Sequence, residues 1–358
     1  FKQKTAYEIM PSLVGSEMCI RDRMMVKRSC LNYILGVGLS IFVITNLILL
    51  KLPNSIFGNF GGVLYLRRIR KGSQVIKISN LRTLLGKHIP RIKVVVFDMD
   101  GTLSTHPVNP ADPQIIEQII ELTKEGIHVG IVSGASDRIQ KVLFNNFPAD
   151  FQGQEYIHIY GFGGTKGYPL GKDNKIDFSN PYYECSFTEE QRRVVMEVVE
   201  AFKDRYSEDF EAALDRGSKV TIRLRQDRER SDEVMEEYVR FLKGELESKG
   251  MPELVVNAGG SNWGLDILVA DKSRAIEDLV SRIPGVSLEN IMVVADSFSG
   301  LAGNDKAMIL PGVLVFNVGP HQDVPSGIYS LEKKGPEGTK ELMAIFIELL
   351  KMKRQNDN

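Results

Sequence analysis

Cysteine and net charge are both scarce in this sequence, and each shortage excludes a class of protein. Its 358 residues include three cysteines, too few and too scattered for a disulfide framework: Cys19, Cys30 and Cys185. No Cys-x-x-Cys or His-x-x-x-His spacing suggests a zinc site. Lys and Arg total 45 against 46 Asp and Glu, so a net charge of −1 provides no general attraction for nucleic acid. What remains is an ordinary globular composition, long enough for about two domains.

The first 23 residues have neither helical nor strand periodicity. Their stretch YEIMPSLVGSEMCIRDR resembles a peptide that arises when sequencing-adapter DNA is translated. We therefore interpret residues 1–23 as a non-native extension and expect the native chain to start at Met24 or Met25.

A long apolar run follows, from Leu31 to Leu50, and it contains no charged residue. Its length matches the hydrocarbon core of a membrane, so residues 24–52 are predicted to form one uncleaved transmembrane anchor. More cations follow the run than precede it, which predicts that the long C-terminal part lies in the cytoplasm; a soluble cytoplasmic protein is the alternative. Residues 53–92 are Gly-rich and then basic, and we interpret them as a linker.

From Lys93 onward, short apolar runs alternate with amphipathic helical stretches, which predicts an α/β fold on a parallel sheet. The expected strands are 93–97, 128–132, 156–160, 265–269, 290–295 and 313–317, and the expected helices are 113–124, 136–147, 188–206, 231–250, 273–282 and 339–353. Within 219–226, KVTIRLRQ alternates at period two, which indicates a sheet with one wet face. We therefore expect an α+β module at 183–270, inserted between two core segments, 93–182 and 271–358.

The first of these strands ends in DMDGTL, and this stretch points to phosphate chemistry. Asp98 and Asp100 lie two residues apart at the carboxyl edge of the sheet and point the same way. A carboxylate can attack phosphorus, but two anions facing a phosphate require a divalent cation, and Mg²⁺ fits. Gly101 allows a sharp turn, and Thr102 can donate hydrogen bonds to phosphate oxygens.

VVVFDMDGTL resembles the first motif of the haloacid dehalogenase superfamily, and three further motifs follow in order. IVSG, ADKSRAI and VVADSFSGLAGND supply Ser133, Lys272, Asp296 and Asp305. The resemblance implies a Rossmann-like core and a full set of site residues. By it, the catalytic residues are Asp98, Asp100 and Lys272, the phosphate-binding residues Gly101, Thr102, Ser133 and Gly134, the metal ligands Asp98, Asp100 through its carbonyl, Asp296 and Asp305, and the supporting residue Asn304.

The place of the inserted module resembles the C2 cap of sugar-phosphate phosphatases and phosphomannomutases. On its alternating strand, Lys219, Arg223 and Arg225 lie on one face and are candidate substrate contacts. Two features depart from the family pattern: Ala295 replaces a glycine, and the loop from Asp296 to Asn304 is lengthened as in phosphomannomutases. The division of roles between Asp296 and Asp305 therefore stays open.

These expectations combine into a Mg²⁺-dependent phosphatase that hydrolyses a small phosphorylated metabolite, a sugar phosphate above all, through an aspartyl-phosphate. One alternative is phosphomannomutase-like transfer to a hexose phosphate. The other is an inactive, membrane-tethered binding protein on a decayed fold. Nucleic acid is not an expected partner, and the oligomeric state is left open.

Overall fold

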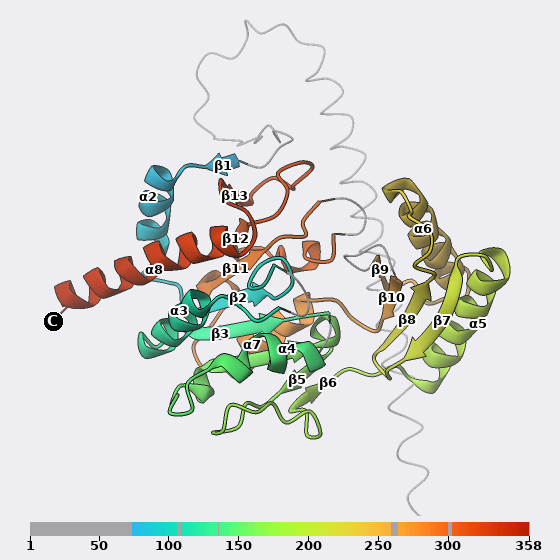
Figure 1. The fold of residues 1–358 in the computed structure, drawn as a ribbon, viewed down its shortest axis with the longest axis horizontal. Coiled ribbons are helices and arrows are strands. Elements are labelled where there is room, and N and C mark those ends of the chain that lie inside the picture. The colour runs from blue at the N-terminus through green and yellow to red at the C-terminus, as the bar shows by residue number, and fades with distance from the viewer. Residues whose placement is uncertain (1–73, 106–108, 135, 259–263, 300–302, 358) are drawn as a thin grey trace, which may run out of the picture. The chain divides into compact units, whose positions relative to one another are not determined.

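The computed structural model describes residues 74–105, 109–134, 136–258, 264–299 and 303–357 (Figure 1). The chain divides into two units, and all of these residues belong to the second, residues 69–358. The predicted anchor at 24–52 and the interpreted extension at 1–23 lie outside the described residues and stay predictions. Among the helices that are described, none is long and apolar enough to cross a membrane.

The larger part of this unit is built on a nine-stranded sheet, with strand order β1-β13-β12-β11-β2-β3-β4-β5-β6. The run from β1 to β4 is parallel, and β5 and β6 extend it antiparallel. The strands are β1 (Gln74–Ile76), β2 (Val94–Asp98), β3 (His128–Val132), β4 (Ile157–Gly161), β5 (Lys166–Tyr168), β6 (Tyr183–Glu184), β11 (Ile291–Ala295), β12 (Leu314–Asn317) and β13 (Tyr329–Leu331). Because the chain leaves β2 toward β3 and later returns on its other side at β11, a switch point lies between β2 and β11, where open α/β sheets bind ligands.

Helices cover both faces of this sheet (Figure 1). They are α2 (Ile78–His88), α3 (Pro113–Lys124), α4 (Asp137–Val142), α7 (Ser273–Arg282) and α8 (Gly335–Asp357). In β2, Val95 and Phe97 pack into the cluster formed with α2, α3, α4 and α8, whereas Val94 and Val96 pack toward α7. Burial on both faces explains why the strand reads as an unbroken apolar run.

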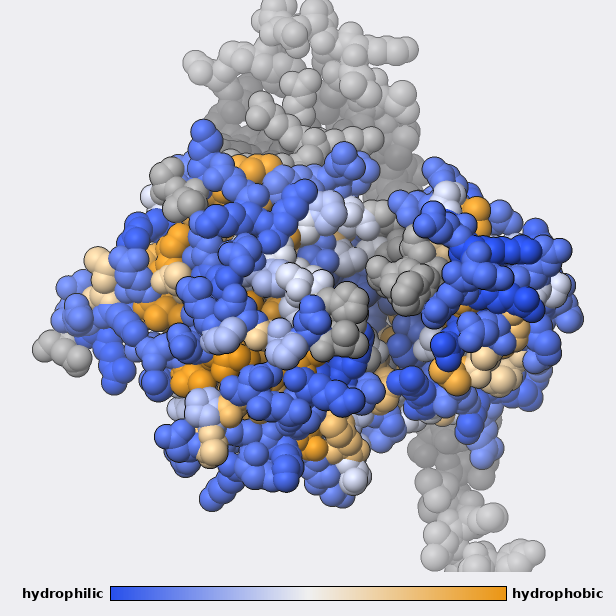
Figure 2. All heavy atoms as spheres, viewed as in Figure 1, coloured by the Kyte–Doolittle hydropathy of each residue, from blue (hydrophilic) through white to orange (hydrophobic). Residues whose placement is uncertain are grey.

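A smaller antiparallel sheet is inserted between β6 and α7, and we call residues 187–268 the inserted module. Its strand order is β7-β8-β10-β9, and helices α5 and α6 pack against one face. The elements are α5 (Glu189–Arg205), β7 (Phe210–Asp215), β8 (Lys219–Leu224), α6 (Asp232–Ser248), β9 (Val255–Ala258) and β10 (Gly264–Leu268). The alternation predicted for β8 is present, since Val220, Ile222 and Leu224 are buried in the module's apolar core and Arg223 is exposed. The face of the module that Figure 2 shows is mostly hydrophilic.

The interpretation of 53–92 as a linker is wrong for its last part. β1 pairs in parallel with β13 and extends the main sheet, and α2 buries Leu81 and Leu85 in the same cluster as α8. Arg82 of α2 also forms an ion pair with Glu348 of α8, at 2.6 Å. Sequence reasoning missed this helix because its apolar stripe is short and basic residues surround it. The main domain therefore begins before Lys93.

Candidate active site

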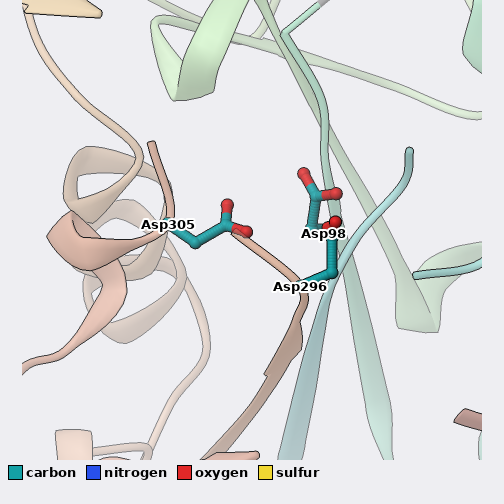
Figure 3. Close-up of side chains that lie close together, drawn as sticks. All are labelled: Asp98, Asp296 and Asp305. Carbon is teal, nitrogen blue, oxygen red and sulfur yellow. The ribbon is translucent and has the colours of Figure 1, made fainter. Parts of the chain in front are cut away.

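Three carboxylates meet at the carboxyl edge of the main sheet, beside the switch point. Asp98 ends β2, Asp296 follows β11, and Asp305 comes from the loop beyond; Figure 3 shows the three side chains gathered. Their ligand atoms lie within 4.8 Å of one another. The parallel pairing of β2 with β11 explains the meeting of the first two, because it brings their carboxyl ends side by side.

Lys272 binds two of these acids from the start of α7. Its Nζ donates to Asp98 Oδ1 and to Asp305 Oδ1, both at 2.6 Å, and makes a longer contact of 3.3 Å with Asn304 Oδ1. Burial acts to lower the pKa of Lys272, but Asp305 and Asp98 outweigh it and raise that pKa above its usual value. The ammonium is therefore a fixed positive charge in contact with the Asp98 carboxylate.

Asp305 and Asp296 differ in what their oxygens already bind. Asp305 accepts from Lys272 with one oxygen and from the backbone N–H of Ser297 with the other, at 2.8 Å, and its side chain is fully buried. Asp296 accepts a weak hydrogen bond from Thr102 Oγ1, at 3.3 Å. This geometry favours Asp296 as the ligand of a cation and Asp305 as the residue that holds Lys272 and the loop.

The acidic group fits a hard divalent cation. Burial raises the pKa of Asp98 well above its usual value, against the opposing effect of Lys272. Burial and the charge of Asp305 raise the pKa of Asp296 to about 6. Both shifts show that the ionised acids lack compensating positive charge, which a bound cation would supply, and the donors are carboxylate oxygens, which Mg²⁺ prefers.

The turn after β2 depends on Gly101. Its φ is +81°, and a Cβ built there would lie 2.7 Å from Cγ of Asp296, so both backbone conformation and close approach exclude a side chain. The hydroxyl of Thr339 in α8 donates a hydrogen bond to the carbonyl of Thr102 at 2.8 Å and so supports the same turn. Thr102 itself is fully buried.

The predicted phosphate-binding pair lies one strand further along. β3 pairs with β2 so that Asp98 is opposite Val132, which places Ser133 and Gly134 just beyond the strand end. Ser133 is buried, its N–H donates to the Tyr160 carbonyl, and its own carbonyl accepts from Gly163. A Cβ built on Gly134 would meet nothing within 4 Å, so there is space at this edge of the loop. Their role in binding phosphate stays a prediction.

Asp100 does not join the three clustered acids. Its Oδ2 accepts a hydrogen bond from Arg138 Nη2 at 2.8 Å, and about a third of each side chain is exposed, 32% for Asp100 and 29% for Arg138. Sequence reasoning missed Arg138. A cation near the start of the helix that follows the Ser133 loop was a usable signal, because such a helix begins at the same sheet edge as Asp100.

The three cations predicted on β8 have different surroundings. Lys219 is buried, and its Nζ donates to Asp266 Oδ2 at 2.9 Å and to the Gly134 carbonyl at 3.1 Å. Arg223 lies 3.7 Å from Glu211, and Arg225 donates to the carbonyl of Phe210. Lys219 therefore joins the inserted module to the Ser133 loop, while Arg223 and Arg225 contact residues of their own module. Contact of any of the three with a substrate stays a prediction.

No model of a known protein family matches the sequence, and no curated protein matches it. Solved structures do match its fold. An IMP-bound IMP-nucleotidase mutant from Plasmodium falciparum is 14% identical with a TM-score of 0.56, covering 74% of this chain and 69% of its own. A C-terminally truncated form of that enzyme is 14% identical with a TM-score of 0.57, covering 76% of each chain.

Trehalose-6-phosphate phosphatase from Aspergillus fumigatus also matches, with 17% identity and a TM-score of 0.51, covering 77% of this chain and 100% of its own. At such low identity the likeness concerns the fold alone. The described part of this chain therefore shares its fold with these two enzymes, a parallel α/β sheet that carries an inserted module.

Proposed function

We propose that this chain is a phosphatase that hydrolyses a small phosphorylated metabolite through a phosphorylated Asp98. The observation that carries the proposal is the Asp98–Lys272–Asp305 arrangement at the carboxyl edge of β2, with both Lys272 contacts at 2.6 Å. A buried lysine costs stability unless it is paired, so its place beside Asp98 indicates a site built around that carboxylate. The fold shared with two phosphatases agrees with this.

The proposed reaction has two halves. In the first, one oxygen of Asp98 forms a bond to phosphorus while the bond to the ester oxygen breaks, and Asp100 gives that oxygen a proton. In the second, water gives its proton to Asp100 and attacks the same phosphorus, which releases inorganic phosphate and restores Asp98. Lys272 and Ser133 would stabilise the negative charge that develops on the phosphoryl oxygens.

Mg²⁺ is the proposed cofactor. Asp98, Asp296 and the carbonyl of Asp100 would hold it, and Asp305 with Asn304 would keep Lys272 in place from the next layer. When bound, the ion supplies the positive charge that lets a phosphate approach several carboxylates.

The substrate class rests on the inserted module and on the neighbours. The module's open sheet face carries Thr221, Asp266 and Arg223, which are groups that can bind hydroxyls or a second phosphate. The neighbours' titles name an IMP-nucleotidase and a trehalose-6-phosphate phosphatase, which suggests nucleoside monophosphates and sugar phosphates as substrates to try. We favour a sugar phosphate.

The test is release of inorganic phosphate from a panel of esters that includes IMP, trehalose 6-phosphate and hexose phosphates, each with Mg²⁺ and with a chelator. We expect Mg²⁺-dependent hydrolysis that Asp98→Asn lowers at least about 10³-fold. Asp150→Asn is the matched control: Asp150 is exposed on the surface of the main domain, and its substitution should leave the rate unchanged. An Asp98→Asn variant as fast as the wild type would refute the proposal. Isomerisation of a hexose phosphate, with little free phosphate, would favour the mutase alternative.

A further inference from the structure

The pair formed by Arg138 and Asp100 is the feature that extends the proposed function furthest. Asp100 is the proposed acid and base, and the N–H group nearest to its Oδ2 among the described contacts belongs to Arg138, at 2.8 Å. Asp100 is not among the three acids whose ligand atoms lie within 4.8 Å of one another. One oxygen of its carboxylate instead contacts α4 through Arg138.

The backbone on both sides of the pair is held firmly. On one side, Gly101 N–H donates to the Ser104 carbonyl at 2.8 Å, which closes the turn that carries Asp100. On the other, Ile139 and Val142 of α4 are buried in the core, and the Val142 carbonyl accepts from Ala111 N–H at 2.9 Å. The guanidinium thus reaches Asp100 from an anchored helix, while about a third of each side chain remains open to solvent.

We propose that Arg138 is the positioning residue for Asp100: it holds the carboxyl group where it can protonate the leaving oxygen of the substrate. This inference rests on the proposed phosphatase function. Without Arg138, repulsion from Asp98 and Asp296 would favour other orientations of the Asp100 carboxyl group. A guanidinium also suits the task, because its planar fork fixes the direction of a carboxylate better than a single ammonium does.

The consequence is a dependence on the leaving group. An alkyl phosphate leaves as a strongly basic alkoxide and needs the proton from Asp100, whereas p-nitrophenyl phosphate leaves as a stable phenolate and needs it little. Loss of a positioned acid should therefore slow the first ester much more than the second. The quantity to compare is kcat/KM, because it reports the steps up to departure of the alcohol.

The experiment measures kcat/KM of the full chain with Mg²⁺ on an alkyl phosphate and on p-nitrophenyl phosphate. We expect Arg138→Met to lower the alkyl value about 100-fold and the aryl value less than about threefold, with Arg138→Lys recovering part of the loss. Arg138→Met in an Asp100→Asn background should cost nothing further, because the group it positions is already gone. Lys141→Met, an exposed cation on the same short helix, is the control and should change neither ester.

The outcomes separate the two levels of the proposal. A wild-type protein that hydrolyses neither these two esters nor any ester of the panel above would refute the proposed function and this inference with it. An active wild type in which Arg138→Met slows both esters equally, or adds its full loss to that of Asp100→Asn, would overturn the role of Arg138 alone. Thermal unfolding of Arg138→Met should match the wild type closely, since a pair this exposed contributes little to stability.

Discussion

The core and the inserted module differ in how they bury charged side chains. At the core site, the side chains of Lys272 and its partners Asp98 and Asp305 are 4%, 7% and 0% exposed, so the ions lie in the interior. In the inserted module, apolar residues fill the space between the sheet and α5 and α6, and pairs such as Arg228–Glu208 lie at the surface. Its buried cations, Lys219 and Arg230, each pair with one aspartate that is 20% exposed, so no group of buried acids gathers around them. The module has an ordinary apolar core. The main domain instead has a charged cluster beside its switch point, and the desolvation of that cluster costs stability.

This difference teaches where function is built into the structure. A protein that only needed stability would gain from apolar residues in place of the buried ions, because desolvation offsets most of their attraction. The presence of this buried charged cluster therefore indicates where the functional site lies. The same comparison ranks the effects of mutations, with the largest expected in the core cluster and the smallest on the module's open face.

Lys272→Met should have the largest effect and is the strongest test of this difference between the two regions. It leaves Asp98 and Asp305 buried without their cation, so we expect activity to fall at least about 10³-fold and unfolding free energy to fall by about 3–5 kcal/mol. Chemical denaturation and phosphate release measure the two effects. Lys203→Met in α5 is the counterpart in the inserted module. Its surface pair with Glu200 is about half exposed, and stability should stay close to that of the wild type. Equal losses in the two variants would contradict the contrast drawn between the regions.

Gly101→Ala tests the same site and should have a smaller effect. The substitution strains a φ of +81° and also forces the new Cβ against Asp296, whose Cγ would be 2.7 Å away. We expect activity to fall about 10- to 100-fold and stability by about 1–3 kcal/mol, because the displaced carboxylate no longer faces Asp98.

Gly250→Ala supplies the control from the inserted module. Its φ is +77°, close to that of Gly101, but a Cβ there would meet nothing within 4 Å. It should lose about 1 kcal/mol or less for the backbone conformation and keep full activity. If both variants lost activity alike, backbone strain and not the contact with Asp296 would be responsible.

The sequence predicted best what depends on local pattern. The unbroken apolar run before Asp98 identified β2, and the bounds of α3, α7 and β3 agree with their expected ranges, 113–124, 273–282 and 128–132. Because four such elements carry Asp98, Ser133, Lys272 and Asp296 at their ends, a residue's place in the chain was enough to bring the site together. β1 and β13 were missed because each has three residues, too few for a period to show.

What sequence reasoning could not supply is the choice of partner within the site. Asp296 and Asp305 are the same residue type on one loop, and only the orientation of that loop directs Asp305 to Lys272 and to the Ser297 amide. Arg138 is a partial case, since its place near the start of α4 signals the sheet edge but does not identify Asp100 as its partner. Lys219 shows the reverse error. Its place on the alternating strand suggested an open, substrate-facing cation, yet it is buried because it reaches across to the core.

The smallest expected effects concern the strand where the two regions meet. Lys219→Met removes the donor shared by Asp266 and the Gly134 carbonyl, and it should lower kcat/KM about tenfold, mostly through KM, because the Ser133 loop loses a support and not a reacting group. Arg223→Met, two pleats along the same face, breaks only a 3.7 Å contact with Glu211 and should stay within about 0.5 kcal/mol of wild-type stability. Steady-state kinetics on one ester distinguishes them. If Arg223→Met raised KM as much as Lys219→Met, the open face of the module would be binding substrate, and the contrast between a charged core and a passive module would have to be abandoned.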